Sequence, residues 1–188
     1  MARIVSGTAR GRRLRVPQRG TRPTTERVRE SLFNALEAAG EVVDATVLDL
    51  YAGSGALGLE ALSRGAADVY FVEEDRKAVA ILRRNVAEVG LGGTVRHATV
   101  AKALACPAAV RADLVLVDPP YAVTDAQLRS EMAALAAGGW VGDGGLVIIE
   151  RSPPDGEDCW PPGFDVIRVQ RYRDTTVYWA EYRPGETG

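Results

Sequence analysis

The sequence is poor in the residues from which covalent, metal and histidine-based sites are built. It has two cysteines, Cys106 and Cys159, and one histidine, His97. The cysteines match no Cys-x-x-Cys spacing and have no histidine cluster beside them, so we expect thiols and neither a disulfide nor a metal site. A histidine-based triad would have to use His97, whose place at a strand end favours packing or a ligand rim.

Long apolar runs are also absent. No stretch approaches the roughly 20 apolar residues that span a bilayer, and the N-terminus shows no apolar signal-peptide core. The 188 residues are 46% hydrophobic and 26% charged, values typical of one soluble globular domain with a sizeable core. We therefore expect a cytoplasmic protein without a membrane partner, and a monomer is the simplest expectation.

Positive charge is concentrated at one end of the chain. The formal net charge is −2, yet residues 1–30 contain nine arginines and only two glutamates. A basic arm on an acidic body is typical of proteins that bind phosphate groups, and arginine is the side chain that binds phosphate with two parallel hydrogen bonds. This pattern favours a nucleic-acid partner over a merely solvated surface.

A glycine turn lies at the centre of the pattern, within residues 47–58. A short apolar run carries Asp49 near its end, Gly53 and Gly55 follow, and an apolar helical pattern comes next. The order strand, glycine turn and helix presents backbone N–H groups to nucleotide-like ligands. By itself this turn is equally compatible with a structural role.

Acidic residues at two further strand ends strengthen the site interpretation. Glu73 ends the run 69–73, where an acid can bind both hydroxyls of a ribose, and Asp118-Pro119-Pro120-Tyr121 follows the run 112–117. In an open parallel sheet the carboxyl ends of the strands face one crevice, so we expect these groups to meet there.

The element order predicts a doubly wound α/β fold. Strands and helices alternate from residue 46 to residue 150, and the chain ends in an antiparallel hairpin, so we expect a Rossmann-like seven-stranded sheet with one antiparallel strand near its edge. We expect residues 1–20 to form a separate small hairpin, a basic arm, with strands at 3–5 and 13–16. A linker follows at 18–25, and Thr24 or Thr25 caps the next helix. Asp75 caps a later helix, which Gly90 ends. The predicted strands of the sheet are 46–50, 69–73, 94–97, 112–117, 144–150, 164–172 and 175–182.

Two sets of residues resemble a known family. The stretch 49–55, the acid Glu73 and the motif at 118–121 resemble the S-adenosylmethionine-dependent amino-methyltransferases. More narrowly, residues 3–7 and 22–34 are similar to the bacterial 16S ribosomal RNA guanine-N2 methyltransferases of the RsmD type. The resemblance covers nearly the whole chain and implies that residues 21–188 form a methyltransferase domain.

The resemblance implies S-adenosyl-L-methionine as cofactor. It places Gly53 and Gly55 along the methionine moiety, Asp49 near its amine and Glu73 on the ribose hydroxyls. The adenine would lie beside the loop that holds Thr99, where many methyltransferases have aspartate. The implied cofactor-binding residues are Asp49, Tyr51, Gly53, Gly55, Glu73, Thr99, Val100 and Asp118.

The motif at 118–121 suits the methylation of a base amine. Such an amine is a poor nucleophile because its lone pair is delocalised into the ring. Asp118 can accept a hydrogen bond from one N–H of the amine, and a carbonyl oxygen of Pro119 or Pro120 can accept one from the other N–H. These two bonds direct the nitrogen lone pair at the methyl group. Tyr121 can stack on the base. These four are the predicted catalytic residues, and no strong base is required.

The resemblance also implies a partner, 16S ribosomal RNA, free or within a 30S particle. The predicted RNA-binding residues are Arg10, Arg12, Arg13, Arg22, Thr24 and Asn34. Three alternatives stay open at this point: a DNA or other amino-group methyltransferase with the same motif, a nicotinamide dehydrogenase that uses the glycine turn, and a non-catalytic RNA-binding module.

Overall fold

The computed structural model describes residues 2–17, 26–152 and 156–185, which form a two-stranded and a seven-stranded sheet. The expected linker at 18–25, with Arg22, Thr24 and the helix cap sought at Thr24 or Thr25, lies outside these residues. Among the helices described, none combines the length and the apolar character needed to cross a membrane.

The large sheet has the predicted topology. Its strand order is β5-β4-β3-β6-β7-β9-β8, and only β9 runs antiparallel to the others. The doubly wound prediction with a terminal hairpin is therefore confirmed. The strands are β3 (Thr46–Leu50), β4 (Asp68–Glu73), β5 (Thr94–His97), β6 (Ala112–Val117), β7 (Val141–Arg151), β8 (Phe164–Arg171) and β9 (Thr176–Tyr182).

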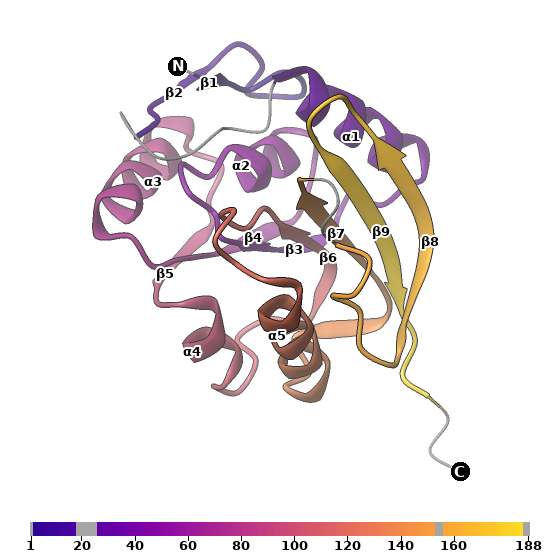
Figure 1. Ribbon diagram of the computed structural model, residues 1–188. Helices are drawn as coiled ribbons and strands as arrows, with labels where there is room; N and C mark the ends of the chain where they lie inside the picture. Colours follow the sequence, from indigo (N-terminus) through magenta and orange to yellow (C-terminus); the bar gives the residue numbers. More distant parts are fainter. Residues whose placement is uncertain (1, 18–25, 153–155, 186–188) are drawn as a thin grey trace.

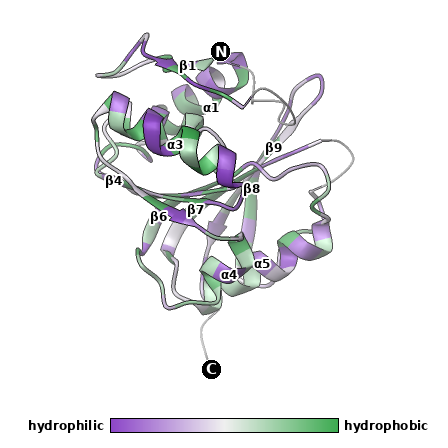
Figure 2. Cartoon of the chain, turned by 90° about the vertical axis from the view of Figure 1, so that its left-hand side faces the viewer, coloured by the Kyte–Doolittle hydropathy of each residue, from purple (hydrophilic) through white to green (hydrophobic). Residues whose placement is uncertain are grey.

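Helices cover both faces of this sheet (Figure 1). The helices α1 (Glu26–Ala38), α2 (Ala56–Ser63) and α3 (Arg76–Val89) lie on one face, and α4 (Val100–Leu104) and α5 (Asp125–Ala137) lie on the other. Figure 2 shows α3 in front of the sheet, with hydrophilic and hydrophobic residues alternating along it. One stripe of this helix therefore packs inward and the opposite one faces solvent.

Local sequence signals set the bounds of α3. The Asp75 side chain accepts a hydrogen bond from the Ala78 amide at 2.8 Å, which satisfies one of the unpaired donors of the first turn. Gly90 ends the helix with φ 71°, a left-handed conformation that glycine adopts without strain. Both residues were expected at these positions.

The alternation of side chains along the strands divides the core into two layers. Val47, Leu114 and Ile148 pack under α1–α3, whereas their neighbours Leu48 and Val115 pack against α4 and α5. Successive residues of a strand point to opposite faces. The same alternation therefore decides on which face of the sheet a polar residue just after a strand end lies.

The N-terminal arm is part of the main core. Its strands β1 (Ala2–Arg3) and β2 (Arg13–Leu14) pair over two residues each, less than the expected runs 3–5 and 13–16. The reason is that the amides of Val5 and Ser6 donate to the buried Glu60 carboxylate, at 2.8 and 3.0 Å, and not to a partner strand. Four arm residues also join the core layer under α1–α3, namely Ala2, Ile4, Ala9 and Leu14.

Candidate active site

A cavity of about 950 Å³ opens where the parallel strands end, on the face of the sheet that carries α1–α3. This volume is within the range of cofactor and ligand sites in enzymes. Its walls come from the glycine turn after β3, the ends of β4, β6 and β7, the first turns of α1 and α3, and the turn at 172–175 between β8 and β9. The strand-end residues predicted to share a crevice therefore do so.

The two glycines of the turn have different surroundings. Gly53 has φ 55° and lines the cavity, and a Cβ atom there would come no closer to other groups than 3.9 Å, from the Tyr51 carbonyl oxygen. Gly55 has φ 82°, and a Cβ atom there would lie 2.4 Å from the Leu82 side chain. Gly53 thus leaves room for a ligand, and Gly55 leaves room for the packing of α3.

Glu73 braces the glycine turn. One carboxylate oxygen accepts a hydrogen bond from the Gly53 amide, and the other accepts one from the Asp75 amide, both at 2.7 Å. Because each carboxylate oxygen can accept more than one hydrogen bond, these contacts fix the carboxylate beside the cavity and keep acceptor positions toward it. This is the arrangement expected for a group that binds paired hydroxyls.

Asp49 is a buried acid at the floor of the cavity. Its side chain accepts a hydrogen bond from the Gly58 amide at 2.9 Å and is 1% exposed. Burial raises the pKa of Asp49 to about 7; the Gly58 amide opposes the rise and the nearby Glu73 carboxylate adds to it. A cationic amine bound here would stabilise the ionised carboxylate.

Tyr51 connects the glycine turn to the opposite layer. Its hydroxyl donates to the Glu131 carboxylate of α5 at 2.6 Å, and burial together with this contact raises its pKa. Tyr51 has φ 59°, an uncommon conformation for a residue with a side chain, and such strain is frequent next to functional sites. Tyr51 is among the residues that line the cavity, while its hydroxyl contacts α5.

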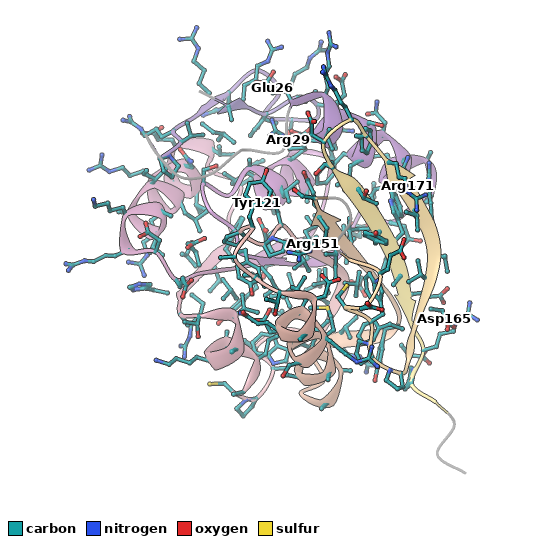
Figure 3. The ribbon with its side chains drawn as sticks, in the orientation of Figure 1. Glu26, Arg29, Tyr121, Arg151, Asp165 and Arg171 are labelled. Atoms are coloured by element: carbon teal, nitrogen blue, oxygen red, sulfur yellow. The ribbon has the colours of Figure 1, made fainter. Side chains whose placement is uncertain are left out.

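The Asp118-Pro119-Pro120-Tyr121 motif forms the wall at the end of β6. The Pro120 carbonyl accepts the Val123 amide at 3.0 Å, so the Pro119 carbonyl is the better candidate for the acceptor of a second amine hydrogen. Tyr121 is 66% exposed, which leaves its ring available for stacking. Figure 3 shows Tyr121 between Arg29 of α1 and Arg151 at the end of β7.

Several predicted site residues lie elsewhere. Thr99 caps α4, where its hydroxyl accepts from the Lys102 amide at 3.1 Å, and Val100 is buried; neither lines the cavity. Their assignment to adenine stays a prediction without support from the cavity's shape. Asn34 accepts a hydrogen bond from Arg64 at 3.0 Å and is also absent from the cavity wall.

The predicted RNA-binding arginines of the arm are exposed. Arg10, Arg12 and Arg13 all reach solvent, and Arg12 donates to the Glu88 carbonyl of α3 at 2.7 Å. This contact attaches the arm to the C-terminal end of α3.

Sequence reasoning missed buried charges around the cavity. Arg29 lines the wall at 1% exposure, with its Nε 3.6 Å from Glu60; burial lowers its pKa and Glu60 opposes this. Arg151 pairs with Asp125 at 3.0 Å. A signal for Arg29 exists, because it stands three and four residues before Leu32 and Phe33 on the apolar stripe of α1.

Comparison with known proteins matches residues 2–181 to the family described as Conserved hypothetical protein 95. Ribosomal RNA small subunit methyltransferase D of Escherichia coli K12 is 40% identical over 167 residues, 88% of this chain and 82% of that protein. The chain belongs to this family. The resemblance to the RsmD type is confirmed, and the chain is a methyltransferase.

Solved structures share the fold of this chain. The structure described as "Putative methyltransferase yhhF from Escherichia coli" is 37% identical, with a TM-score of 0.85 over 97% of this chain and 98% of that one. An RNA methyltransferase of Salinibacter ruber, in complex with S-adenosyl-L-homocysteine, shares the fold at 20% identity, with a TM-score of 0.65 over 88% and 99% of the two chains. Within this family the dehydrogenase and the non-catalytic alternatives are not favoured.

Proposed function

We propose that this methyltransferase transfers a methyl group from S-adenosyl-L-methionine to the exocyclic N2 of a guanine in 16S ribosomal RNA. The observation that carries the proposal is the meeting of the glycine turn, Glu73 and the motif at 118–121 in one cavity, in a chain of the RsmD type. The DNA alternative would use the same motif, but the family membership does not favour it.

The cavity fits the proposed cofactor. Its donor and acceptor set matches the ligand: Asp49 for the amine, the open side of Gly53 for the methionine chain, and Glu73 for the ribose hydroxyls. When bound, S-adenosyl-L-methionine supplies an electrophilic methyl group on a sulfonium. The residues of this chain then have to hold a base amine in line with that methyl group.

Asp118 and the Pro119 carbonyl would accept hydrogen bonds from the two N–H groups of the amine and thereby fix the direction of the nitrogen lone pair. Tyr121 would stack on the base once it has left its helix or loop. The methylated amine is a strong acid until it loses a proton, so the proton can leave to water or to Asp118 without a dedicated base.

We also propose where and with what the protein acts. The substrate would be the 30S particle, assembled or in assembly, in the cytoplasm, with the enzyme as a monomer. Residues 1–20 would contact phosphates, and residues 21–188 would carry the catalytic domain. The exposed Arg10, Arg12 and Arg13 support this division of roles.

The direct test offers labelled S-adenosyl-L-methionine with 30S particles, naked 16S RNA or duplex DNA, followed by nucleoside analysis. N2-methylguanine from the RNA or the particles alone is the expected product. Labelled adenine from DNA, or no transfer despite bound cofactor, would contradict the proposal.

Neutralising the arm should separate RNA binding from cofactor binding. A triple variant with glutamine at positions 10, 12 and 13 is expected to bind RNA more weakly and with less salt dependence. The log–log slope should fall by about 0.7 to 0.9 for each phosphate that an arginine no longer neutralises. Cofactor affinity from calorimetry should be unchanged. An unaltered salt slope would show that the arm arginines do not reach the RNA backbone.

Asp49 should make cofactor binding depend on pH. Since its pKa lies at about 7, protonation at lower pH removes the charge that attracts the cofactor amine, and the Kd should rise about tenfold between pH 8 and pH 6. The amine titrates in the same range, so Asp49→Asn is the control and should lose this rise. If the Kd depends on pH equally in the two proteins, Asp49 does not bind the cofactor amine.

The raised pKa of Asp49 affects the folding stability of the ligand-free protein in the direction opposite to its effect on cofactor binding. The folded state holds the Asp49 proton more tightly than the unfolded chain, whose ordinary value is 3.8. The contribution of this group to stability is thus complete at low pH and is lost as pH rises from about 4 to 7.

A further inference from the structure

The motif at 118–121 does not by itself select guanine. Its two acceptors suit any exocyclic base amine, including those of adenine and cytosine. What distinguishes the guanine amine is its neighbour in the ring: N1 carries a hydrogen, whereas the ring nitrogen next to the amine of adenine or cytosine is bare. A site for guanine N2 therefore needs a further acceptor next to the group that holds the amine.

The strand register places a carboxylate at that point. In the parallel pair of β6 and β7, Val117 is the partner of Ile149 and is the last residue of β6, so Asp118 and Glu150 are the residues that directly follow the last pair. Neighbouring strands lie about 4.8 Å apart, and paired residues point to the same face. Both side chains line the cavity.

Contacts from the terminal hairpin orient this carboxylate. The Thr175 hydroxyl donates to Glu150 Oε1 at 3.0 Å, and Thr175 belongs to the turn that closes the cavity. Tyr172, at the start of that turn, donates its hydroxyl to Ser31 of α1 at 3.0 Å. The turn is therefore anchored on the far side as well. A carboxylate offers about four acceptor positions, so one that is oriented by a hydroxyl can also accept from a ligand.

We propose that Glu150 accepts the N1–H of the target guanine and so makes the enzyme selective for guanine, with Thr175 as the residue that positions it. The inference rests on the proposed function and adds a specificity residue to it. A bare ring nitrogen facing Glu150 would place two acceptors against each other, which disfavours adenine, cytosine and 2-aminopurine alike.

The sharpest probe is 2-aminopurine, which keeps the 2-amino group but has a bare N1. Once the methylated guanine has been mapped, 30S particles are reconstituted with either guanine or 2-aminopurine at that position, and kcat and KM are measured for each. In Glu150→Gln the side-chain amide can donate to a bare N1. This variant should lose about ten- to a hundredfold in kcat/KM on guanine, and its preference for guanine over 2-aminopurine should shrink by about a hundredfold.

Two more variants separate selectivity from structure. Thr175→Val removes the orienting hydroxyl at similar size and should lower the preference in the same direction by a smaller factor. Asp165→Asn, at an exposed carboxylate of β8 in the same hairpin but away from the cavity wall, should leave the preference as in the wild type. Thermal stability and cofactor Kd are expected to be unchanged in all three.

The outcomes distinguish this inference from the function on which it rests. If the wild type forms no N2-methylguanine, the proposed function fails. If the wild type forms it and Glu150→Gln keeps the wild-type preference, Glu150 does not read N1–H. Should Glu150→Gln not yield folded protein, an unchanged preference in Thr175→Val would overturn the inference equally.

Discussion

Replacement of Asp118 by alanine is expected to reduce methyl transfer by about a hundred- to a thousandfold while the cofactor still binds. Asp118 follows β6 and lines the cavity beside the Pro119 carbonyl. Without it, one amine hydrogen has no acceptor, and the nitrogen lone pair is no longer held toward the methyl group. The loss should therefore appear in kcat, because the interaction is made as the amine becomes a nucleophile.

The measurement is single-turnover methyl transfer to 30S particles, with cofactor Kd from calorimetry on the same preparations. Asp118→Asn is the matched control, because its amide oxygen can still accept a hydrogen bond. It should retain more activity than the alanine variant. If alanine at position 118 keeps wild-type turnover, Asp118 is not part of the mechanism; if it also abolishes cofactor binding, its role lies in the cofactor site.

The sequence predicted the residues at the strand ends because one rule governs them. In a parallel sheet the carboxyl ends of the strands meet at one edge, so Glu73 and Asp118 could be brought together without knowledge of any packing. The same reasoning did not separate Gly53 from Gly55. Which glycine faces a ligand depends on where Leu82 of α3 packs, and that is a tertiary contact.

Residues that act through distant contacts were beyond sequence reasoning. Glu150 becomes a candidate only when β6 and β7 are known to be neighbours in a given register. Thr99 was placed beside adenine by resemblance, and this stays a prediction; that its hydroxyl caps α4 is what the structure adds. The arm was predicted as a unit of its own from its charge and from the linker after it. Its attachment to Glu60 of the largely apolar α2 is a tertiary contact that neither signal contains.

Because the arm is part of the core, its role in RNA binding is better tested by substitution than by deletion. Deletion of residues 1–20 would remove Ala2, Ile4, Ala9 and Leu14 from the main core, so it would perturb the fold as well as the RNA contacts. Substitution of exposed arginines avoids this problem. What attaches the arm to the core can be tested separately, by substitution of Glu60.

Glu60 is the acceptor around which the arm, α1 and α2 are joined. Its fully buried carboxylate accepts the amides of Val5 and Ser6 and the Arg64 Nε, the last at 2.7 Å, and it lies 3.6 Å from the Arg29 Nε. Arg29 in turn donates to the Arg3 carbonyl of the arm at 2.5 Å. Two buried cations and two backbone donors therefore depend on one carboxylate.

Glu60→Ala is accordingly expected to lower the free energy of unfolding by about 3–5 kcal/mol, a large share of the roughly 5–15 kcal/mol typical of a domain. It leaves two buried guanidinium groups without their shared counter-charge, and this cost exceeds the loss of the hydrogen bonds themselves. Urea unfolding at neutral pH measures it, and amide exchange at Val5 and Ser6 should accelerate.

The matched control is Glu37→Ala, which removes the other carboxylate that pairs with Arg64, at 2.6 Å. Because the Glu37 side chain is 40% exposed, water can replace it, and the expected loss is below about 1 kcal/mol. Comparable losses in the two variants would mean that burial of the ion pairs is not what makes Glu60 important. A loss below about 1 kcal/mol in Glu60→Ala itself would mean that apolar contacts of Ile4 and Leu14 hold the arm, and that Glu60 only sets its backbone direction.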